Sequence, residues 1–264
     1  MKYNAGFVGV GNMGGALFMA ACKAENACTL SIFDTNSQKC DEVSKQTGAV
    51  STDIADLVSN SRLVFLGVKP NIIKTVAESV SQYKNQNTVF VSMAAGIDTK
   101  TLCDYLGTDK VIRIMPNTPA AVGEGMLLYC TADGVSQTDV QMFLYLMSKV
   151  GVVDKIDEAH IDAAAALSGC GPAFVYMFAD ALADGAVKCG LPRDKALLYA
   201  KQTIMGSGVM MLNSQKHPEQ LKDEVCSPGG TTIEGVLALE NNNFRHAVSS
   251  AVIAAYEKTS KLKK

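Results

Sequence analysis

The chain has 264 residues, with 24 Lys and Arg against 26 Asp and Glu and a net charge of −2. This balance offers no electrostatic footprint for nucleic acid or an anionic membrane, and a hydrophobic content of 48% excludes an intrinsically disordered chain. At about 150 residues per domain, the length fits one large domain or two smaller ones. We expect no membrane span, because no apolar run approaches the roughly 18–20 residues that a span requires.

The eight cysteines, Cys28 among them, are scattered without a C-x-x-C pair, and no histidine lies at zinc-ligand spacing. We therefore expect a cytoplasmic protein with free thiols and no metal site. The start of the chain superficially resembles a secretory signal. Five glycines interrupt it, however, and it fits a strand, a turn and a helix better.

Apolar strands and helical segments alternate over residues 1–153. We expect helices at 13–24 and 37–47, the second with Ser37 as its N-cap. Apolar strands joined by helical crossovers predict an α/β domain with a doubly wound, mostly parallel sheet covered on both faces. The expected strands lie at 5–10, 29–33, 62–68, 88–93 and 111–115.

After Asp157 the strands stop and the pattern becomes helical. His217 precedes a proline, so we expect it to cap a helix. The basic chain end, with Lys263 and Lys264, is expected to be a solvated helix terminus. The expected domains are 1–155 (α/β) and 156–264 (all-α), and the expected helices of the second are 158–168, 172–190, 193–213, 217–226, 231–241 and 243–262.

The helix at 172–190 is unusually apolar. Its charged residues are Asp180, Asp184 and Lys188, which form one narrow stripe, with Asp184 and Lys188 spaced to pair. A surface helix normally shows a broad polar face. We therefore expect this helix to be buried against a second subunit, which predicts a homodimer; burial within the chain alone is the alternative.

Residues 9–14 read Gly-Val-Gly-Asn-Met-Gly, directly after an apolar strand and at the start of a helix. This is the context that a dinucleotide-binding loop requires. Gly9 permits the tight turn, Gly11 lets the backbone approach a pyrophosphate, and Gly14 lets the helix pack close to the strand. Asn12 and Met13 open the helix, whose unpaired N–H groups would receive the phosphates. The alternative is a glycine-rich turn without a ligand.

Asp34 ends the second expected strand, 20 residues after Gly14. A carboxylate there accepts hydrogen bonds from an adenosine ribose and repels a 2′-phosphate, which favours NAD over NADP. Asp34 is followed by the polar residues Thr35, Asn36 and Ser37. Their side chains support the alternative, in which this position binds the 2′-phosphate of NADP.

Three further expected strands are followed by residues that are placed to contact a bound ligand. Because ligands of an open parallel sheet bind beyond the carboxyl ends of its strands, we place Val68, Lys69, Pro70, Ala95 and Asn117 along the nicotinamide half of the cofactor. For Lys69 the alternative is a buried structural cation. None of these residues is an obvious general base.

The stretch 227–232 reads Ser-Pro-Gly-Gly-Thr-Thr and precedes a helix. Two glycines at a helix N-terminus make an anion site, with N–H groups that converge on a carboxylate. The alternative is a plain helix start with Thr231 or Thr232 as the N-cap. A second glycine-rich stretch, 167–174, either approaches a ligand or separates two apolar helices.

These strings resemble the pyrroline-5-carboxylate reductase family, in order and over essentially the whole chain. The most specific string is HPEQLKDEVCSPGGTTIEGV at 217–236, whereas GFVGVGNMGGA at 6–16 is shared by many dehydrogenases. The other matching strings are FLGVKP (65–70), VSMAAGI (91–97), RIMPNTPA (113–120), ALSGCGPAFVY (166–176) and DALADGAVKCGLPR (180–193).

The resemblance implies an N-terminal Rossmann domain and a helical C-terminal domain that dimerises by interleaving, often within a ring of dimers. It implies reduction of L-1-pyrroline-5-carboxylate to L-proline, the last step of proline biosynthesis, by NADPH or NADH. The implied substrate contacts are Glu158, Thr231 and Thr232, with Ser227, Gly229 and Gly230 around the carboxylate. The implied cofactor contacts are Gly9 to Gly14, Asp34, Thr35, Val68, Lys69, Pro70 and Ala95.

The chain departs from the family pattern at four positions. Cys170 and Phe174 replace a common Ser and Tyr, and Ile54 and Glu224 lie where some members have a cofactor-contacting Asn. These departures affect single contacts and leave the resemblance intact.

The implied chemistry is hydride transfer from nicotinamide C4 to C5 of a cyclic imine. A protonated imine accepts hydride readily, so only a hydrogen-bond partner near the ring nitrogen is needed, and Thr232, with an ordered water, is our candidate catalytic residue. A β-hydroxyacid dehydrogenase is the alternative enzyme, but the position of its catalytic Lys holds Val175. A non-catalytic dinucleotide sensor, the third reading, has no use for the 227–232 loop.

Overall fold

The computed structural model describes residues 1–26 and 29–262. The expectations for Cys28, Lys263 and Lys264 fall outside these residues. The sheet has eight strands in the order β3-β2-β1-β4-β5-β6-β7-β8. The strands are β1 (Tyr3–Val8), β2 (Leu30–Phe33), β3 (Val50–Ser51), β4 (Ser61–Leu66), β5 (Val89–Ser92), β6 (Val111–Met115), β7 (Gly125–Thr131) and β8 (Gly151–Lys155).

The predicted mostly parallel sheet is confirmed. Among the strand pairings that the structure describes, β6 with β7 is antiparallel and the others are parallel. Sequence analysis missed β3, β7 and β8. β3 has only two residues. β8 is mostly exposed, including Val152 at 55%, so its sequence contains no long apolar run.

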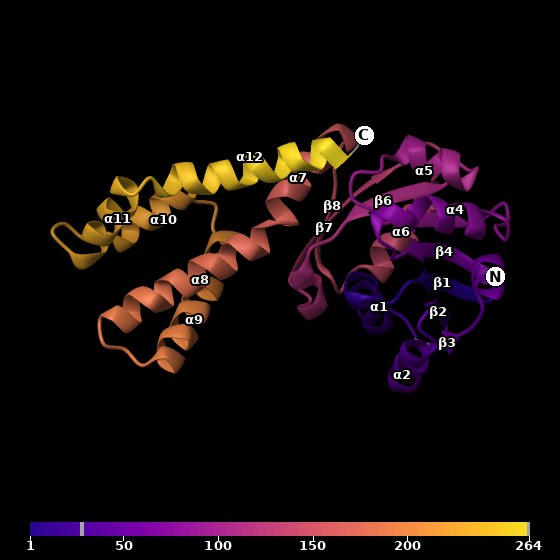
Figure 1. Cartoon of the computed structure of the whole chain (residues 1–264), viewed down its shortest axis with the longest axis horizontal. Coiled ribbons are helices and arrows are strands. Elements are labelled where there is room, and N and C mark those ends of the chain that lie inside the picture. Colours follow the sequence, from indigo (N-terminus) through magenta and orange to yellow (C-terminus); the bar gives the residue numbers. More distant parts are fainter. Residues whose placement is uncertain (27–28, 263–264) are drawn as a thin grey trace. The chain divides into compact units, whose positions relative to one another are not determined.

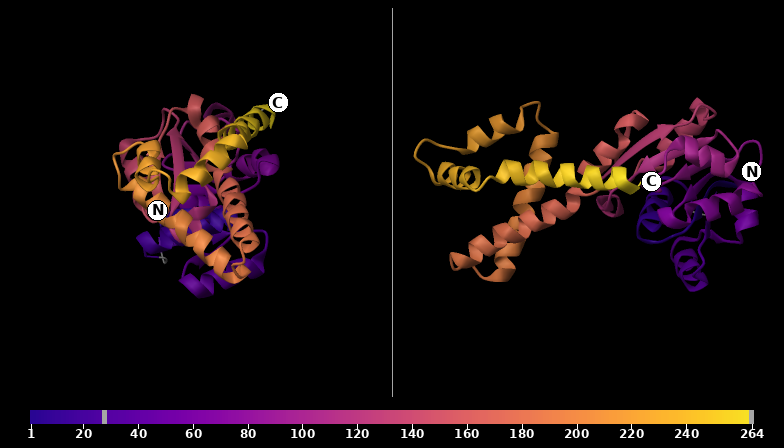
Figure 2. Two further views of the ribbon diagram at one scale, coloured as in Figure 1. Left: turned by 90° about the vertical axis from the view of Figure 1, so that its left-hand side faces the viewer. Right: turned by 45° about the horizontal axis from the view of Figure 1, so that its top comes forward.

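Helices cover both faces of the sheet (Figures 1 and 2). Residues of α1, α2 and α6 contribute to the core on one face, and residues of α3, α4 and α5 to the core on the other. Stacked rings of Phe7 and Phe65, with centroids 4.4 Å apart, join β1 to β4 inside the first core. The helices are α1 (Asn12–Ala24), α2 (Ser37–Thr47), α3 (Ile54–Asn60), α4 (Ile73–Ser81), α5 (Thr99–Leu106), α6 (Gln137–Leu146) and α7 (Glu158–Ser168).

Two expected helix caps have different outcomes. Asn36, and not Ser37, is the N-cap of α2, because the Asn36 side chain accepts a hydrogen bond from the backbone N–H of Lys39 at 3.2 Å. Ser37 is the first helical residue. The expected cap at His217 is confirmed, since its Nδ1 accepts from the backbone N–H of Glu219 at 3.2 Å.

The chain divides into two compact units, Met1–Cys170 with Ala255–Lys264, and Gly171–Ala254. The secondary-structure type changes earlier, after β8. The boundary between the units lies after α7 and not after β8, because α7 packs on the sheet. Ile161 and Ala165 of α7 pack against Leu128 and Cys130 of β7.

The second unit is helical. The pair expected between Asp184 and Lys188 is replaced by an ion pair from Arg193 to Asp184, at 2.6 Å. Alanines Ala183, Ala196 and Ala200 form the buried contact between α8 and α9. Its helices are α8 (Gly171–Lys188), α9 (Arg193–Leu212), α10 (Pro218–Val225), α11 (Thr231–Asn241) and α12 (Phe244–Leu262), the last of which continues beyond the unit.

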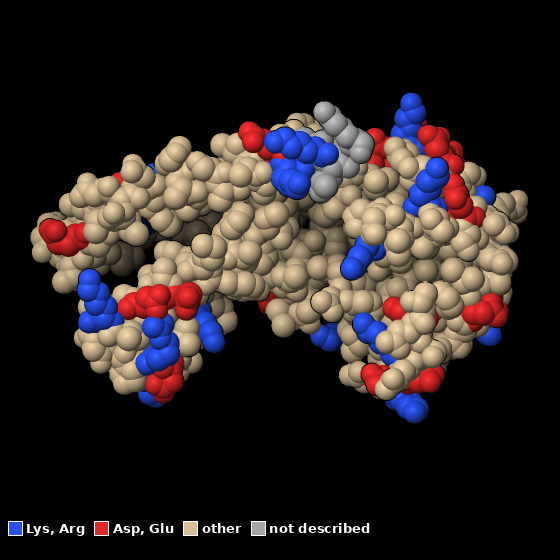
Figure 3. Space-filling view, in the orientation of Figure 1, with Lys and Arg blue, Asp and Glu red and all other residues tan. Residues whose placement is uncertain are grey.

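Large apolar side chains of α8 are exposed in the single chain. Tyr176 and Met177 are 63% and 73% exposed, and an apolar groove of about 560 Å³ lies between α8 and α12. Figure 3 shows few charges along α8 and the first part of α12, and charges gathered at the C-terminal end of α12 and around α9 and its turn to α8. The alternative that α8 is buried within its own chain is therefore wrong.

The helical stretch Glu158–Lys188 is long and apolar enough to cross a membrane by length and composition alone. The expectation that no run approaches that length is therefore wrong for this stretch. Helices that bury their apolar side chains in protein pass the same test, and the α7 part packs on the sheet through Ile161 and Ala165. The stretch is weak evidence for a membrane span.

Asp139 joins two parts of the first unit and provides a test of its stability. Its carboxylate is 2% exposed, accepts from Ser136 Oγ at 2.6 Å in the cap of α6, and accepts from Arg62 Nε at 2.7 Å. We expect Asp139→Ala to lower the free energy of unfolding by about 2–4 kcal/mol, because the ion pair and the Asp139 half of the capping box are lost and Arg62 is left without its partner. Chemical denaturation measures this change. Asp41→Ala, at an exposed position of α2, is the control, and equal stability of the two variants would contradict the prediction.

Candidate active site

Three backbones meet where β1 joins α1. Gly9 has φ of +90°, and a Cβ there would lie 2.7 Å from the carbonyl oxygen of Gly67. A Cβ on Gly14 would lie 2.2 Å, and one on Gly67 2.4 Å, from the carbonyl oxygen of Gly9. Real Cβ atoms do not approach that closely, so the contact requires glycine at all three positions.

The surroundings of Gly11 are different. A Cβ at Gly11 would have no heavy atom within 4 Å. Gly11 is the N-cap of α1 without a side-chain cap, and no acidic side chain lies in the first turn, which the exposed Asn12 and half-buried Met13 begin. The space above Gly11 and the N–H groups of this turn are therefore open to an anion.

Asp34 ties the end of β2 to this loop. Its Oδ2 accepts from the backbone N–H of Val10 at 2.9 Å, and its Oδ1 accepts from that of Asn36 at 3.0 Å. A carboxylate has about four acceptor positions, so the remaining ones are free for ribose hydroxyls. The exposed Thr35 and Ser37 lie beside it in sequence, at the start of α2.

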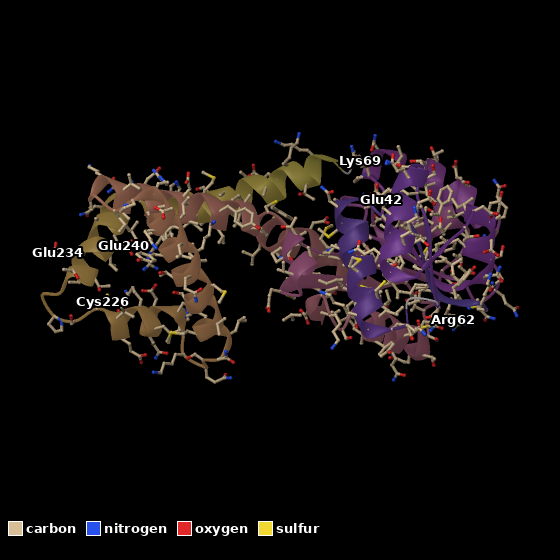
Figure 4. The ribbon with its side chains drawn as sticks, turned by 90° about the horizontal axis from the view of Figure 1, so that it is seen from below. Glu42, Arg62, Lys69, Cys226, Glu234 and Glu240 are labelled. Carbon is tan, nitrogen blue, oxygen red and sulfur yellow. The ribbon has the colours of Figure 1, made fainter. Side chains whose placement is uncertain are left out.

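The segment after β4 presents Val68, Lys69 and Pro70 in sequence. Lys69 is exposed and precedes a short 3₁₀ helix, Pro70–Ile72 (Figure 4). The alternative of a buried structural cation is therefore wrong for Lys69.

Ala95 and Asn117 follow β5 and β6. Ala95 is half-buried and packs in the cluster that contains Ile161 of α7. The amide of Asn117 is engaged within the protein, because Nδ2 donates to the carbonyl oxygen of Ser168 at 3.0 Å and Oδ1 accepts from the N–H of Met126 at 2.9 Å. The side chain of Asn117 therefore shapes the loop, and its direct contact with a cofactor stays a prediction.

Glu158 begins α7 and belongs to a polar cluster that sequence analysis missed. Its Oε1 accepts from Arg113 at 3.1 Å and from the backbone N–H of Thr99 at 2.7 Å, and its Oε2 accepts from Thr99 Oγ1 at 2.5 Å. Arg113 is completely buried and also donates to Asp162 at 2.6 Å.

The thiol of Cys130 lies near this cluster. Burial, followed by the nearby Glu158 carboxylate, raises the pKa of the Cys130 thiol to about 12, so this thiol stays protonated at neutral pH.

In the second unit, Ser227 and Gly230 close a tight turn. The N–H of Gly230 donates to the carbonyl oxygen of Ser227 at 3.0 Å, and Gly229 has φ of +67°. Gly230 is the N-cap of α11 and has no side-chain cap, so the alternative that Thr231 or Thr232 is the N-cap is wrong. Both threonines are exposed in the first turn, which leaves their hydroxyl and N–H groups available to an anion.

The residues that depart from the family pattern have ordinary surroundings. Ile54 packs in the second core of the sheet unit, Cys170 is exposed, and Phe174 lines the apolar groove on α8. Glu224 forms an ion pair with Lys216.

The first unit fits a dinucleotide. Gly9, Gly14 and Gly67 leave no room for side chains below the start of α1, whereas the space above Gly11 is clear. This arrangement lets a pyrophosphate reach the helix N-terminus at the carboxyl edge of a parallel sheet.

Two family models match the chain. The model described as pyrroline-5-carboxylate reductase dimerisation matches residues 158–262, and the one described as NADP oxidoreductase, coenzyme F420-dependent, matches residues 4–96. Together they cover parts of both predicted domains.

Curated relatives match the full length. The chain is 38% identical to a pyrroline-5-carboxylate reductase of Glycine max, over 99% of this chain and 96% of that protein. It is 37% identical to that of Escherichia coli (strain K12), over 100% of both. A crystal structure of Plasmodium falciparum pyrroline carboxylate reductase with NADP bound superposes with a TM-score of 0.88, at 32% identity and full coverage of both chains.

Gly11 allows ligand approach and folding to be tested separately. We expect Gly11→Ala to fold like the wild type, because the added Cβ meets no protein atom. The same Cβ occupies the approach of the pyrophosphate, so NADPH should bind at least about 10-fold more weakly. Quenching or enhancement of NADPH fluorescence measures the dissociation constant. The control is Gly185→Ala, also in open space but in the second unit, and identical affinity in both variants would contradict the prediction.

Proposed function

This chain belongs to the pyrroline-5-carboxylate reductase family, and from this premise we infer that it reduces L-1-pyrroline-5-carboxylate to L-proline, the last step of proline biosynthesis. It is an oxidoreductase that uses NADPH or NADH. The observation that supports this function best is the full-length match to curated reductases together with the dinucleotide cradle at Gly9 to Gly14.

The dinucleotide, when bound, supplies the hydride from nicotinamide C4. The chain's own residues have to hold it and to hold the imine. We assign cofactor binding to Gly9, Gly11, Asn12, Met13, Gly14, Asp34, Thr35, Val68, Lys69, Pro70, Ala95 and Asn117.

The turn at 227–232 is proposed to bind the substrate. The N–H groups of Gly229 and Thr231, beside the uncapped start of α11, hold the carboxylate, and Gly230, whose own N–H donates to Ser227, lets the backbone approach it. Ser227 closes the turn behind them. Glu158, which keeps 31% of its side chain exposed, is the further substrate contact that the family resemblance implies.

Thr232 is the proposed catalytic residue. Its hydroxyl is exposed in the first turn of α11 and can hydrogen-bond the ring nitrogen of the imine. The substrate arrives as a good hydride acceptor once protonated, so an oriented hydroxyl with an ordered water is sufficient. The β-hydroxyacid dehydrogenase alternative has no support at Val175, which cannot transfer a proton.

We propose that residues 1–155 bind the dinucleotide and that residues 156–264 bind the substrate and a second copy of the chain. The exposed apolar side chains of α8 and the match to a dimerisation model over 158–262 support the homodimer. A ring of dimers extends this proposal. Burial of α8 against a second copy would also explain the apolar composition of Glu158–Lys188 without placing this stretch in a membrane.

We also propose a cytoplasmic location. All cysteines that the structure describes are free thiols, which suits a reducing compartment.

Thr232→Val replaces the hydroxyl with a methyl group of similar size. We expect kcat with pyrroline-5-carboxylate to fall by about 10- to 1000-fold, as the loss of one oriented hydrogen bond does. Steady-state oxidation of NADPH and NADH measures it. Thr232→Ser is the matched control and should retain most activity; unchanged kinetics in Thr232→Val would reject the role.

Sedimentation at micromolar concentration tests the homodimer. We expect a species of twice the chain mass or a multiple of it, because a lone chain leaves Tyr176 and Met177 in water. Met177→Lys should shift the population toward monomer, whereas Lys201→Glu, at an exposed position of α9, should not. A stable wild-type monomer would overturn the proposal.

A further inference from the structure

Arg113 is a buried cation for which the proposed chemistry has no use. It lies in the middle of β6 with no exposed side-chain surface, and its two terminal nitrogens pair with Glu158 and Asp162. Its Nε is buried without a hydrogen-bond partner in the described part of the chain. Burying such a cluster is expensive, and apolar residues of similar volume often stabilise a core equally well. This position therefore calls for a role beyond packing.

The cluster connects Arg113 to the start of α5. Arg113 donates to Oε1 of Glu158 at 3.1 Å, and both oxygens of this carboxylate accept hydrogen bonds from Thr99, at 2.7 Å from its N–H and 2.5 Å from its hydroxyl. Thr99 is the first residue of α5. The segment 93–98 before it connects β5 to α5 and contains Ala95, so Glu158 holds one end of this loop.

Packing holds the same loop at a second point. Ala95 packs in the cluster with Ile161 and Ala165 of α7, and Gly96 turns the backbone with φ of +77°. α7 therefore contacts the loop through Ala95 and, through Glu158 at its N-terminus, through Thr99.

Asp162 provides the second anchor for Arg113. It is 5% exposed and accepts from Arg113 at 2.6 Å, one helical turn beyond Glu158 on α7. The planar guanidinium can reach both carboxylates at once, whereas a lysine ammonium offers a single point of charge. Arg113 thereby fixes the rotation of the Glu158 side chain relative to β6.

We propose that Arg113 is a positioning residue: anchored by Asp162, it holds the Glu158 carboxylate on Thr99 and so fixes the 93–98 loop beside the nicotinamide half of the dinucleotide. This proposal rests on the assignment of Ala95 as a cofactor contact. It adds to Glu158 a role that does not depend on contact with the imine. A loop that is already ordered loses less conformational entropy when the dinucleotide binds.

The test measures binary complexes, in which no imine is present. We expect Arg113→Lys to bind NADPH about 10-fold more weakly and Thr99→Val, which keeps its N–H, about 3-fold more weakly. Both variants should bind adenosine 2′,5′-bisphosphate like the wild type, because this fragment lacks the nicotinamide and its ribose. Thr99→Ser retains the hydroxyl and should restore NADPH binding.

Wild-type affinity for NADPH in both Arg113→Lys and Thr99→Val would overturn the proposal. An equal loss of fragment and dinucleotide binding in Thr99→Val would overturn it as well, because it would indicate general destabilisation. If the wild-type protein fails to reduce pyrroline-5-carboxylate while the binary affinities change as expected, the proposed function fails and the positioning role stands.

Discussion

The carbonyl oxygen of Gly9 is the point on which the sheet unit depends. The start of α1 and the end of β4 both come within contact distance of it, at Gly14 and Gly67, with no side chain between them. Because the three backbones touch, the first turn of α1 lies directly over the carboxyl edge of the sheet. Asp34 extends the arrangement to β2 by accepting from the N–H of Val10. A single excess methyl group at this point would push β1, α1 and β4 apart.

Local patterns in the sequence predict the parts of the fold that local interactions decide. The apolar strands between helices predict a mostly parallel sheet, and Gly-x-Gly-x-x-Gly after a strand predicts the position of α1. β8 escapes prediction because it is largely exposed and owes its strand conformation to pairing with β7. The cap of α2 is shifted by one residue because Asn36 and Ser37 are both good caps, and only the backbone conformation decides between them.

Local sequence patterns do not predict the polar cluster around Arg113, because its members lie far apart in the chain. A lone arginine inside an apolar strand signals that a buried charge needs a partner. The partners are 45 and 49 residues away, at Glu158 and Asp162, and sequence spacing offers no means of choosing them among 26 acidic residues. The family resemblance identifies Glu158 as a site residue but is silent on what orients it. Long-range electrostatic pairing is visible only after the sheet has brought β6 and α7 together.

In the proposed homodimer, the exposed apolar face of α8 makes the stability of the helical unit dependent on protein concentration. When a second copy of the chain supplies the missing part of a core, the folded fraction depends on protein concentration, and dilution destabilises the unit much as urea does. The sheet unit has complete cores of its own on both faces and does not share this dependence. A newly made chain can thus possess a finished dinucleotide fold while its helical half still awaits a partner, and during that interval the helical half is the part exposed to proteases and to aggregation.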